Sequence, residues 1–126
     1  MGKVVQAFKS KRGLNNEYDW GLGVEDPFFF SSEFDVANSS VTIAGTQVTH
    51  DHTWPIRYSI IKTSKLGTSV EYYDSIEFCG DQSYGEFQHT FNRIPSGTGY
   101  RLEVFNHFRY HSMGRVRIIS EEKKAS

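Results

Sequence analysis

Apolar and polar residues alternate with a two-residue period along most of the chain, which is the pattern of half-buried β-strands. The clearest alternating runs lie at 56–63, 70–78, 99–107 and 114–119. Asp74 falls among the apolar positions of the second run and breaks its alternation. No segment has a convincing 3.6-residue apolar period, which an amphipathic helix requires. The pattern therefore predicts an all-β protein.

Shorter candidate strands precede these runs. Glu33–Ala37 alternates, and 41–48 is either a tight hairpin turning at Ala44–Gly45 or one long bulged strand. The count reaches about eight or nine strands separated by turn-forming residues, a spacing typical of a sandwich or barrel. We predict a single β-sandwich domain over residues 1–126, with a charged, flexible tail from about residue 121.

Three consecutive phenylalanines, Phe28–Phe30, do not fit one face of a strand, because neighbouring side chains of a strand point to opposite faces. We expect this segment to be a loop that plugs one end of the sandwich. The alternative is an exposed apolar patch, which would be typical of a self-assembling or surface-active structural protein.

A turn-forming cluster at 95–99, Pro-Ser-Gly-Thr-Gly, joins two alternating runs. The spacing of Ile94, the Gly97–Thr98 pair and Tyr100 resembles the corner before the penultimate strand of fibronectin type III and other immunoglobulin-like sandwiches. The resemblance covers about the final third of the chain. It implies an immunoglobulin-like or related Greek-key topology, with the Tyr100 hydroxyl bonded back to the corner backbone. It also implies core positions at Leu102, Val104, Val116 and Ile118, but no activity.

Composition limits the classes of partner. The 126 residues carry 14 Lys and Arg against 15 Asp and Glu, and a net charge of −1 provides no field that would attract nucleic acid. No apolar run reaches the roughly 18 residues of a transmembrane helix, so none is expected. The 10 Phe, 7 Tyr and 2 Trp supply large core side chains that suit strands better than helices.

The compartment has two interpretations. Met1–Phe8 lacks the apolar core of a signal peptide, and Cys79 is the single cysteine, which agrees with a cytosolic protein. Alternatively, Met1–Gly2 begins a mature secreted chain whose leader has been removed. The sandwich architecture favours the secreted or cell-surface interpretation.

Motifs of common enzymes are absent from the sequence. There is no Gly-X-Ser-X-Gly elbow, no His-Glu-X-X-His motif and no phosphate-cradling glycine loop. Cys79 fits a small hydrophobe at a strand end better than a nucleophile. We therefore expect a non-catalytic binding or interaction module without a cofactor.

His50 and His52 support the alternative of a metal-binding protein or metal-dependent enzyme. In an extended segment, residues two apart project to the same side and can supply two imidazoles to one zinc ion. A further ligand would have to come from a carboxylate or from His89, His107 or His111. Calcium at Glu25–Asp26 or Asp81 is another alternative, although neither loop has the dense oxygen-ligand spacing of a dedicated site. The simpler interpretation is a polar loop whose histidines face water.

Two loops carry the candidate ligand-binding residues. The first, 50–54, ends in Trp54, and the second contains His107, Phe108, Arg109, Tyr110 and His111. Exposed aromatic rings beside an arginine can stack on a carbohydrate or a protein partner, with cation–π support. The alternative is that these aromatic residues fold back over the end of the sandwich.

The outward sides of the strands offer a second candidate surface. If the runs at 56–63, 70–78, 99–107 and 114–119 share one sheet, its outward face mixes arginine and aromatic residues: Arg57, Tyr73, Arg101, Phe105, Arg115 and Arg117. Protein and carbohydrate recognition use such mixtures. The simpler interpretation is a solvated sheet with cross-strand ion pairs, each contributing about 0.2–1 kcal/mol.

Overall fold

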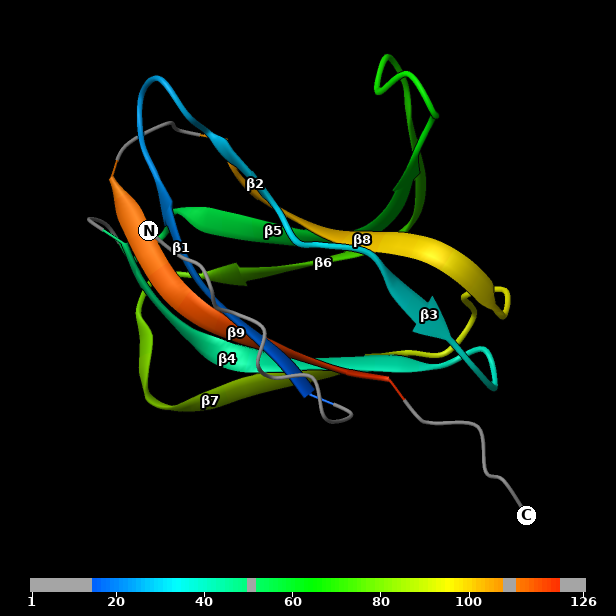
Figure 1. Cartoon of the computed structure of the whole chain (residues 1–126). Helices are drawn as coiled ribbons and strands as arrows, with labels where there is room; N and C mark the ends of the chain where they lie inside the picture. Colours follow the sequence, from blue (N-terminus) through cyan, green and yellow to red (C-terminus); the bar gives the residue numbers. More distant parts are fainter. Residues whose placement is uncertain (1–14, 50–51, 108–110, 121–126) are drawn as a thin grey trace.

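The computed structural model describes residues 15–49, 52–107 and 111–120, which form two antiparallel sheets packed face to face (Figure 1). Within these ranges no helix is long and apolar enough to cross a membrane. The predicted tail from residue 121 lies outside the described residues. The strands are β1 (Asn15–Leu22), β2 (Phe28–Phe30), β3 (Phe34–Val36), β4 (Val41–Thr49), β5 (Pro55–Thr63), β6 (Val70–Cys79), β7 (Gln82–Phe91), β8 (Gly97–Asn106) and β9 (Ser112–Ser120).

The strand order defines a jelly roll. Sheet A has the order β1-β9-β4-β7, and sheet B has the order β2-β8-β5-β6, with β3 also paired to β8. The β5–β6 hairpin stays within sheet B, whereas β4 is followed by a crossing to sheet B and β8 by a crossing to sheet A. A jelly roll consists of two Greek keys. The predicted β-sandwich is confirmed, and its topology is the related Greek-key alternative.

Both sheets contribute to one core. The core positions expected in the last two long strands are buried: Leu102, Val104, Val116 and Ile118. A polar pair is buried among them, since the Tyr58 hydroxyl donates to Oε1 of Gln47 at 2.8 Å. The Gln47 amide nitrogen in turn donates to two backbone carbonyls of sheet B and the turn that follows it. Burial raises the pKa of Tyr58 well above its ordinary value. This hydrogen-bonded pair links the two sheets across the core.

A β-bulge in β6 explains why Asp74 breaks the alternation. The register between β5 and β6 shifts after Ile60, so Tyr73 is an extra residue without a partner of its own in β5. Tyr73 packs against the core, and Tyr72 is on the outward side with its hydroxyl bonded to Glu103. The sequence pattern placed Tyr73 on the outward face. The assignment was wrong because a one-residue slip exchanges the two sides of a strand.

Residues 41–49 form one long strand, β4, as in the second of the two alternatives for this segment. The register with β7 shifts between Gly45 and Gln47, which is the irregularity that the glycine allows. Gly45 also permits a close approach to β9, because a Cβ built there would lie 2.9 Å from Cα of Val116.

Phe28–Phe30 is a strand and not the expected loop plug. It forms β2 at the edge of sheet B and pairs with β8. The rule of alternation holds along it: Phe29 packs against the core, while Phe28 and Phe30 are on the outward side and exposed. The plug was the wrong interpretation because β8 offers an unpaired edge on which these three residues complete the sheet.

The corner expected around Tyr100 is present. The Tyr100 hydroxyl donates a hydrogen bond to the carbonyl of Pro95, and the Tyr100 side chain is 1% exposed. Gly99 has a φ of 83°, in the region that favours glycine, so the turn preceding Tyr100 depends on this residue. The bond ties the β7–β8 turn to the first inward residue of β8.

We expect Tyr100→Phe to lower the free energy of unfolding by about 1 kcal/mol, the usual contribution of one hydrogen bond. The ring packing is retained, so only the bond to Pro95 is lost. Urea denaturation followed by tryptophan fluorescence measures the change. A variant as stable as the wild type would show that the corner hydroxyl does not hold the turn.

Candidate functional site

Side chains from four strands meet on the outward side of sheet B. Phe28 and Phe30 come from β2, Phe105 from β8, Arg57 from β5 and Tyr72 from β6. In the strand register Phe28 lies opposite Phe105, which in turn lies opposite Arg57. We call these five residues the aromatic face.

The members of the aromatic face stack on one another. The ring centres of Phe30 and Phe28 are 6.0 Å apart with 11° between the planes, and those of Phe28 and Phe105 are 4.5 Å apart at 23°. The guanidinium carbon of Arg57 lies 4.9 Å from the ring centre of Phe105 and 5.3 Å from that of Tyr72. Phe28, Phe30 and Tyr72 are nevertheless 40%, 43% and 48% exposed. The stacked rings therefore remain partly open to solvent.

Glu103 holds Arg57 in this stack. Glu103 lies on the outward side of β8, yet its side chain is only 1% exposed. Its carboxylate accepts a hydrogen bond from Nη2 of Arg57 at 3.1 Å and another from the Tyr72 hydroxyl at 2.7 Å. Loss of hydration raises the pKa of Tyr72, and the hydrogen bond to Glu103 raises it further. These contacts hold Arg57 in one position on the sheet.

His107 extends the aromatic face where β8 ends. Its ring meets that of Phe105 edge-on at 4.6 Å, and its Nε2 lies 3.5 Å from a carboxylate oxygen of Glu77. His107 follows the last residue of β8, in the connection where the sequence placed it, and it lies beside the aromatic face. The other predicted stacking residues of that loop, Phe108, Arg109 and Tyr110, lie outside the described residues.

The two predicted binding loops leave the sandwich at the same end. Thr49, the last residue of β4, pairs with Ser112, the first residue of β9. Near the start of β5, Ile56 pairs with Asn106, the last residue of β8. Trp54 directly precedes β5; it is half-buried, and its carbonyl accepts a hydrogen bond from the turn after β6. The topology therefore brings the ends of both loops together, as the sequence hypothesis requires.

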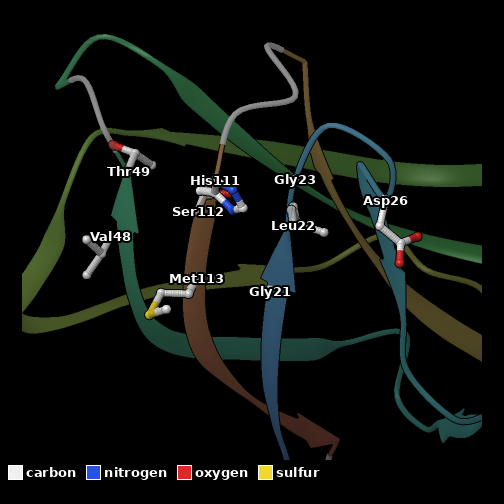
Figure 2. Close-up of a pocket in the computed structure, with 9 residues that line it drawn as sticks. All are labelled: Gly21, Leu22, Gly23, Asp26, Val48, Thr49, His111, Ser112 and Met113. Carbon is white, nitrogen blue, oxygen red and sulfur yellow. The ribbon is translucent and has the colours of Figure 1, made fainter.

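His111 belongs to a different surface from His107. It is exposed and lines a pocket at the end of sheet A, where its ring lies beside Gly23 (Figure 2). His107 instead lies on the outward side of sheet B. The two histidines of this connection therefore lie on two different surfaces.

The metal prediction rests on His50 and His52. His50 lies outside the described residues, and His52 is exposed. Among the residues that the structure describes, no group of three or more His, Cys, Asp or Glu side chains could hold a metal ion. The carboxylate of Asp81, a predicted calcium ligand, accepts a hydrogen bond from the Thr49 amide at 2.8 Å. Zinc at the histidine pair and calcium at the acidic loops stay predictions.

Two arginines expected beside Arg57 lie on the other sheet. Arg115 and Arg117 belong to β9, which pairs with β1 and β4 in sheet A. There Nε of Arg115 lies 2.7 Å from the Asp19 carboxylate, and Arg117 pairs with Glu86. The expectation assumed that the last two strands share a sheet. It was wrong because the chain crosses between sheets after β8.

Tyr72 was not expected on this face, and exposure of Phe28 and Phe30 was expected only under the alternative of a self-assembling or surface-active protein. The sequence contains a signal for each. Phe28 and Phe30 are two apart and therefore share a side of any strand. The misplaced Asp74 marks the bulge that puts Tyr72 on the outward side.

No protein-family model matches this chain, and no curated protein matches it. Among solved structures, it is similar to the crystal structure of a Yersinia pseudotuberculosis-derived mitogen, with a TM-score of 0.46 and 6% sequence identity. The similarity covers 89% of this chain and 90% of the mitogen chain. A likeness at this level carries no argument about function.

Proposed function

We propose that this chain is a non-catalytic binding module that recognises a protein partner through the aromatic face. The observation that carries the proposal is the row of half-exposed, stacked side chains that runs from Phe30 to Arg57 and is anchored by the buried Glu103. Single exposed apolar residues are ordinary on protein surfaces, but a contiguous aromatic patch marks an interaction site.

The stacking geometry favours a protein over a carbohydrate. A sugar ring packs flat against an open aromatic face, but the Phe28 and Phe105 rings stack on each other with centres 4.5 Å apart, and the Arg57 guanidinium lies 4.9 Å from the Phe105 ring centre. Protein interfaces accept aromatic edges, since edge-to-face contacts between rings are favourable. Interface centres are also enriched in aromatic residues and arginine.

The charge arrangement supports the same partner class. Arg57 is already neutralised by Glu103 through a contact of 3.1 Å, so a partner can cover it without leaving an unpaired charge in the interface. The planar guanidinium remains stacked on Phe105 and available for cation–π contact with an incoming ring.

The test combines partner capture with two face variants. The purified chain captures proteins from a lysate of cells that encode it. Each captured protein is identified and purified, and its affinity for the wild type, Phe28→Ser and Arg57→Ala is measured by calorimetry. We expect each substitution to weaken the affinity about tenfold to thirtyfold, the 1.4–2 kcal/mol of a strong interface contact. The control is Arg115→Ala, which removes an exposed arginine of sheet A and is expected to leave the affinity unchanged.

Three results would contradict the proposal. The first is a purified partner that binds both face variants as tightly as the wild type. The second is glycan-array binding that is lost in Phe28→Ser, because it assigns the face to carbohydrate. The third is concentration-dependent dimerisation that Phe28→Ser abolishes, because it assigns the face to a second copy of the chain.

A further inference from the structure

A pocket of about 450 Å³ lies at the end of sheet A (Figure 2). Adjacent strands form its base: Gly21 of β1 pairs with Met113 of β9, which pairs with Val48 of β4. The connection after β1 contributes Asp26, and the residue before β9 contributes His111. We call this site the strand-end pocket.

The strand-end pocket is apolar on a sheet face that is otherwise polar. One row further along the same face, Asp19 and Arg115 form an ion pair at 2.7 Å. At the pocket, by contrast, Val48 is 44% exposed and Met113 is 61% exposed. Exposing these two adjacent apolar side chains to water has an unfavourable hydration free energy. An apolar group bound in the pocket would cover them and remove that cost.

Gly21 keeps the hollow open. A Cβ built on Gly21 would meet no heavy atom within 4 Å, although the residue lies within a paired strand. Any larger residue here would project its side chain into this space. The absence of a side chain therefore leaves room between Met113 and the turn that carries Asp26.

We propose that the strand-end pocket binds a small, largely apolar molecule that is neutral or cationic. The volume lies within the roughly 300–1,000 Å³ of typical ligand pockets. Val48 and Met113 supply apolar contact, and the flexible thioether of methionine adapts to ligands of different shape. Asp26 also lines the pocket, and its negative charge repels an anion. This site is independent of the aromatic face and of the protein partner proposed for it.

A blocking variant tests the proposal. The probe is N-phenyl-1-naphthylamine, a neutral apolar amine whose fluorescence rises when it leaves water. We expect saturable binding to the wild type with one probe per chain. Gly21→Leu fills the open space above Met113 and is expected to weaken binding at least about tenfold, equal to 1.4 kcal/mol. Gly85→Leu is the matched control, because Gly85 is also an exposed strand residue whose Cβ would meet nothing within 4 Å.

Further variants keep each outcome decisive. Circular dichroism establishes that Gly21→Leu is folded, and Met113→Gln replaces it in the test if it is not. Phe28→Ser is expected to retain probe binding, which separates this site from the aromatic face. The anionic relative 8-anilinonaphthalene-1-sulfonate is expected to bind more weakly than the neutral probe, and Asp26→Asn to narrow that difference. Equal binding by Gly21→Leu and wild type, or no saturable binding by the wild type, would overturn the proposal.

Discussion

Replacing Gly45 with alanine is expected to lower the free energy of unfolding by about 3 kcal/mol or more. A Cβ at this position would overlap the carbonyl oxygen of Arg115 and lie 2.9 Å from Cα of Val116. Both atoms are backbone of β9, which is held on its other side by β1. Since no flexible side chain can move aside, the clash must separate β4 from β9 at the centre of sheet A. Overpacking of a closed core lowers the free energy of unfolding by about 1–3 kcal/mol. A clash with backbone atoms is expected to cost as much as the upper end of this range or more.

Chemical denaturation of Gly45→Ala beside Gly85→Ala measures this effect. Gly85 is also a glycine within a strand, but its Cβ would meet nothing within 4 Å. We expect Gly85→Ala to change stability by no more than about 0.5–1 kcal/mol, with a gain as the favoured direction, because alanine restricts the unfolded chain. If both variants were equally stable, the close approach of β4 and β9 would not be a structural requirement.

Removing the carboxylate of Glu103 is expected to cost about 2–3 kcal/mol and to weaken partner binding by the aromatic face. Glu103→Ala deletes the acceptor of Arg57 Nη2 and of the Tyr72 hydroxyl. Breaking a fully buried pair costs about 3–5 kcal/mol. The estimate here is lower because Arg57 is 25% exposed and water can hydrate part of its charge. Without Glu103, Arg57 also loses the contact that holds it against Phe105.

A double-mutant cycle with Arg57→Leu isolates the pair. We expect the double variant to be more stable than the sum of the single losses predicts, because it leaves no unpaired charge. The control is Glu86→Ala, which removes the partner of Arg117 on sheet A. Glu86 is 50% exposed, so about 0–1 kcal/mol is expected there. A Glu103→Ala variant no less stable than Glu86→Ala would show that the buried carboxylate has no special role.

The sequence by itself determined the long alternating strands and most of the core, because burial of one strand face is recorded locally in the alternation of apolar residues. Ile56, Tyr58 and Ile60 alternate and are all fully buried. The role of Tyr100 was implied by the resemblance of its corner to that of immunoglobulin-like sandwiches, which is carried by a few neighbouring residues. These features need only neighbours in the chain, and the structure confirms them.

Pairing between distant strands, by contrast, was decided only by the tertiary structure. Alternation does not record which sheet a strand joins, so Arg115 was expected beside Arg57 although β9 lies in sheet A. A single bulged residue also exchanges the faces of a strand, which put Tyr72 outward and Tyr73 inward.

The candidate site depends on such long-range pairing more than the core does. Glu103 lies on the outward side of its own strand and reads as a solvated carboxylate. It is buried because Arg57 from β5 and Tyr72 from β6 converge on it. Phe28 likewise becomes part of the aromatic face only when β2 places it on Phe105. Burial of the core follows from the local period of the chain, whereas this surface exists only once four separate strands have been placed side by side.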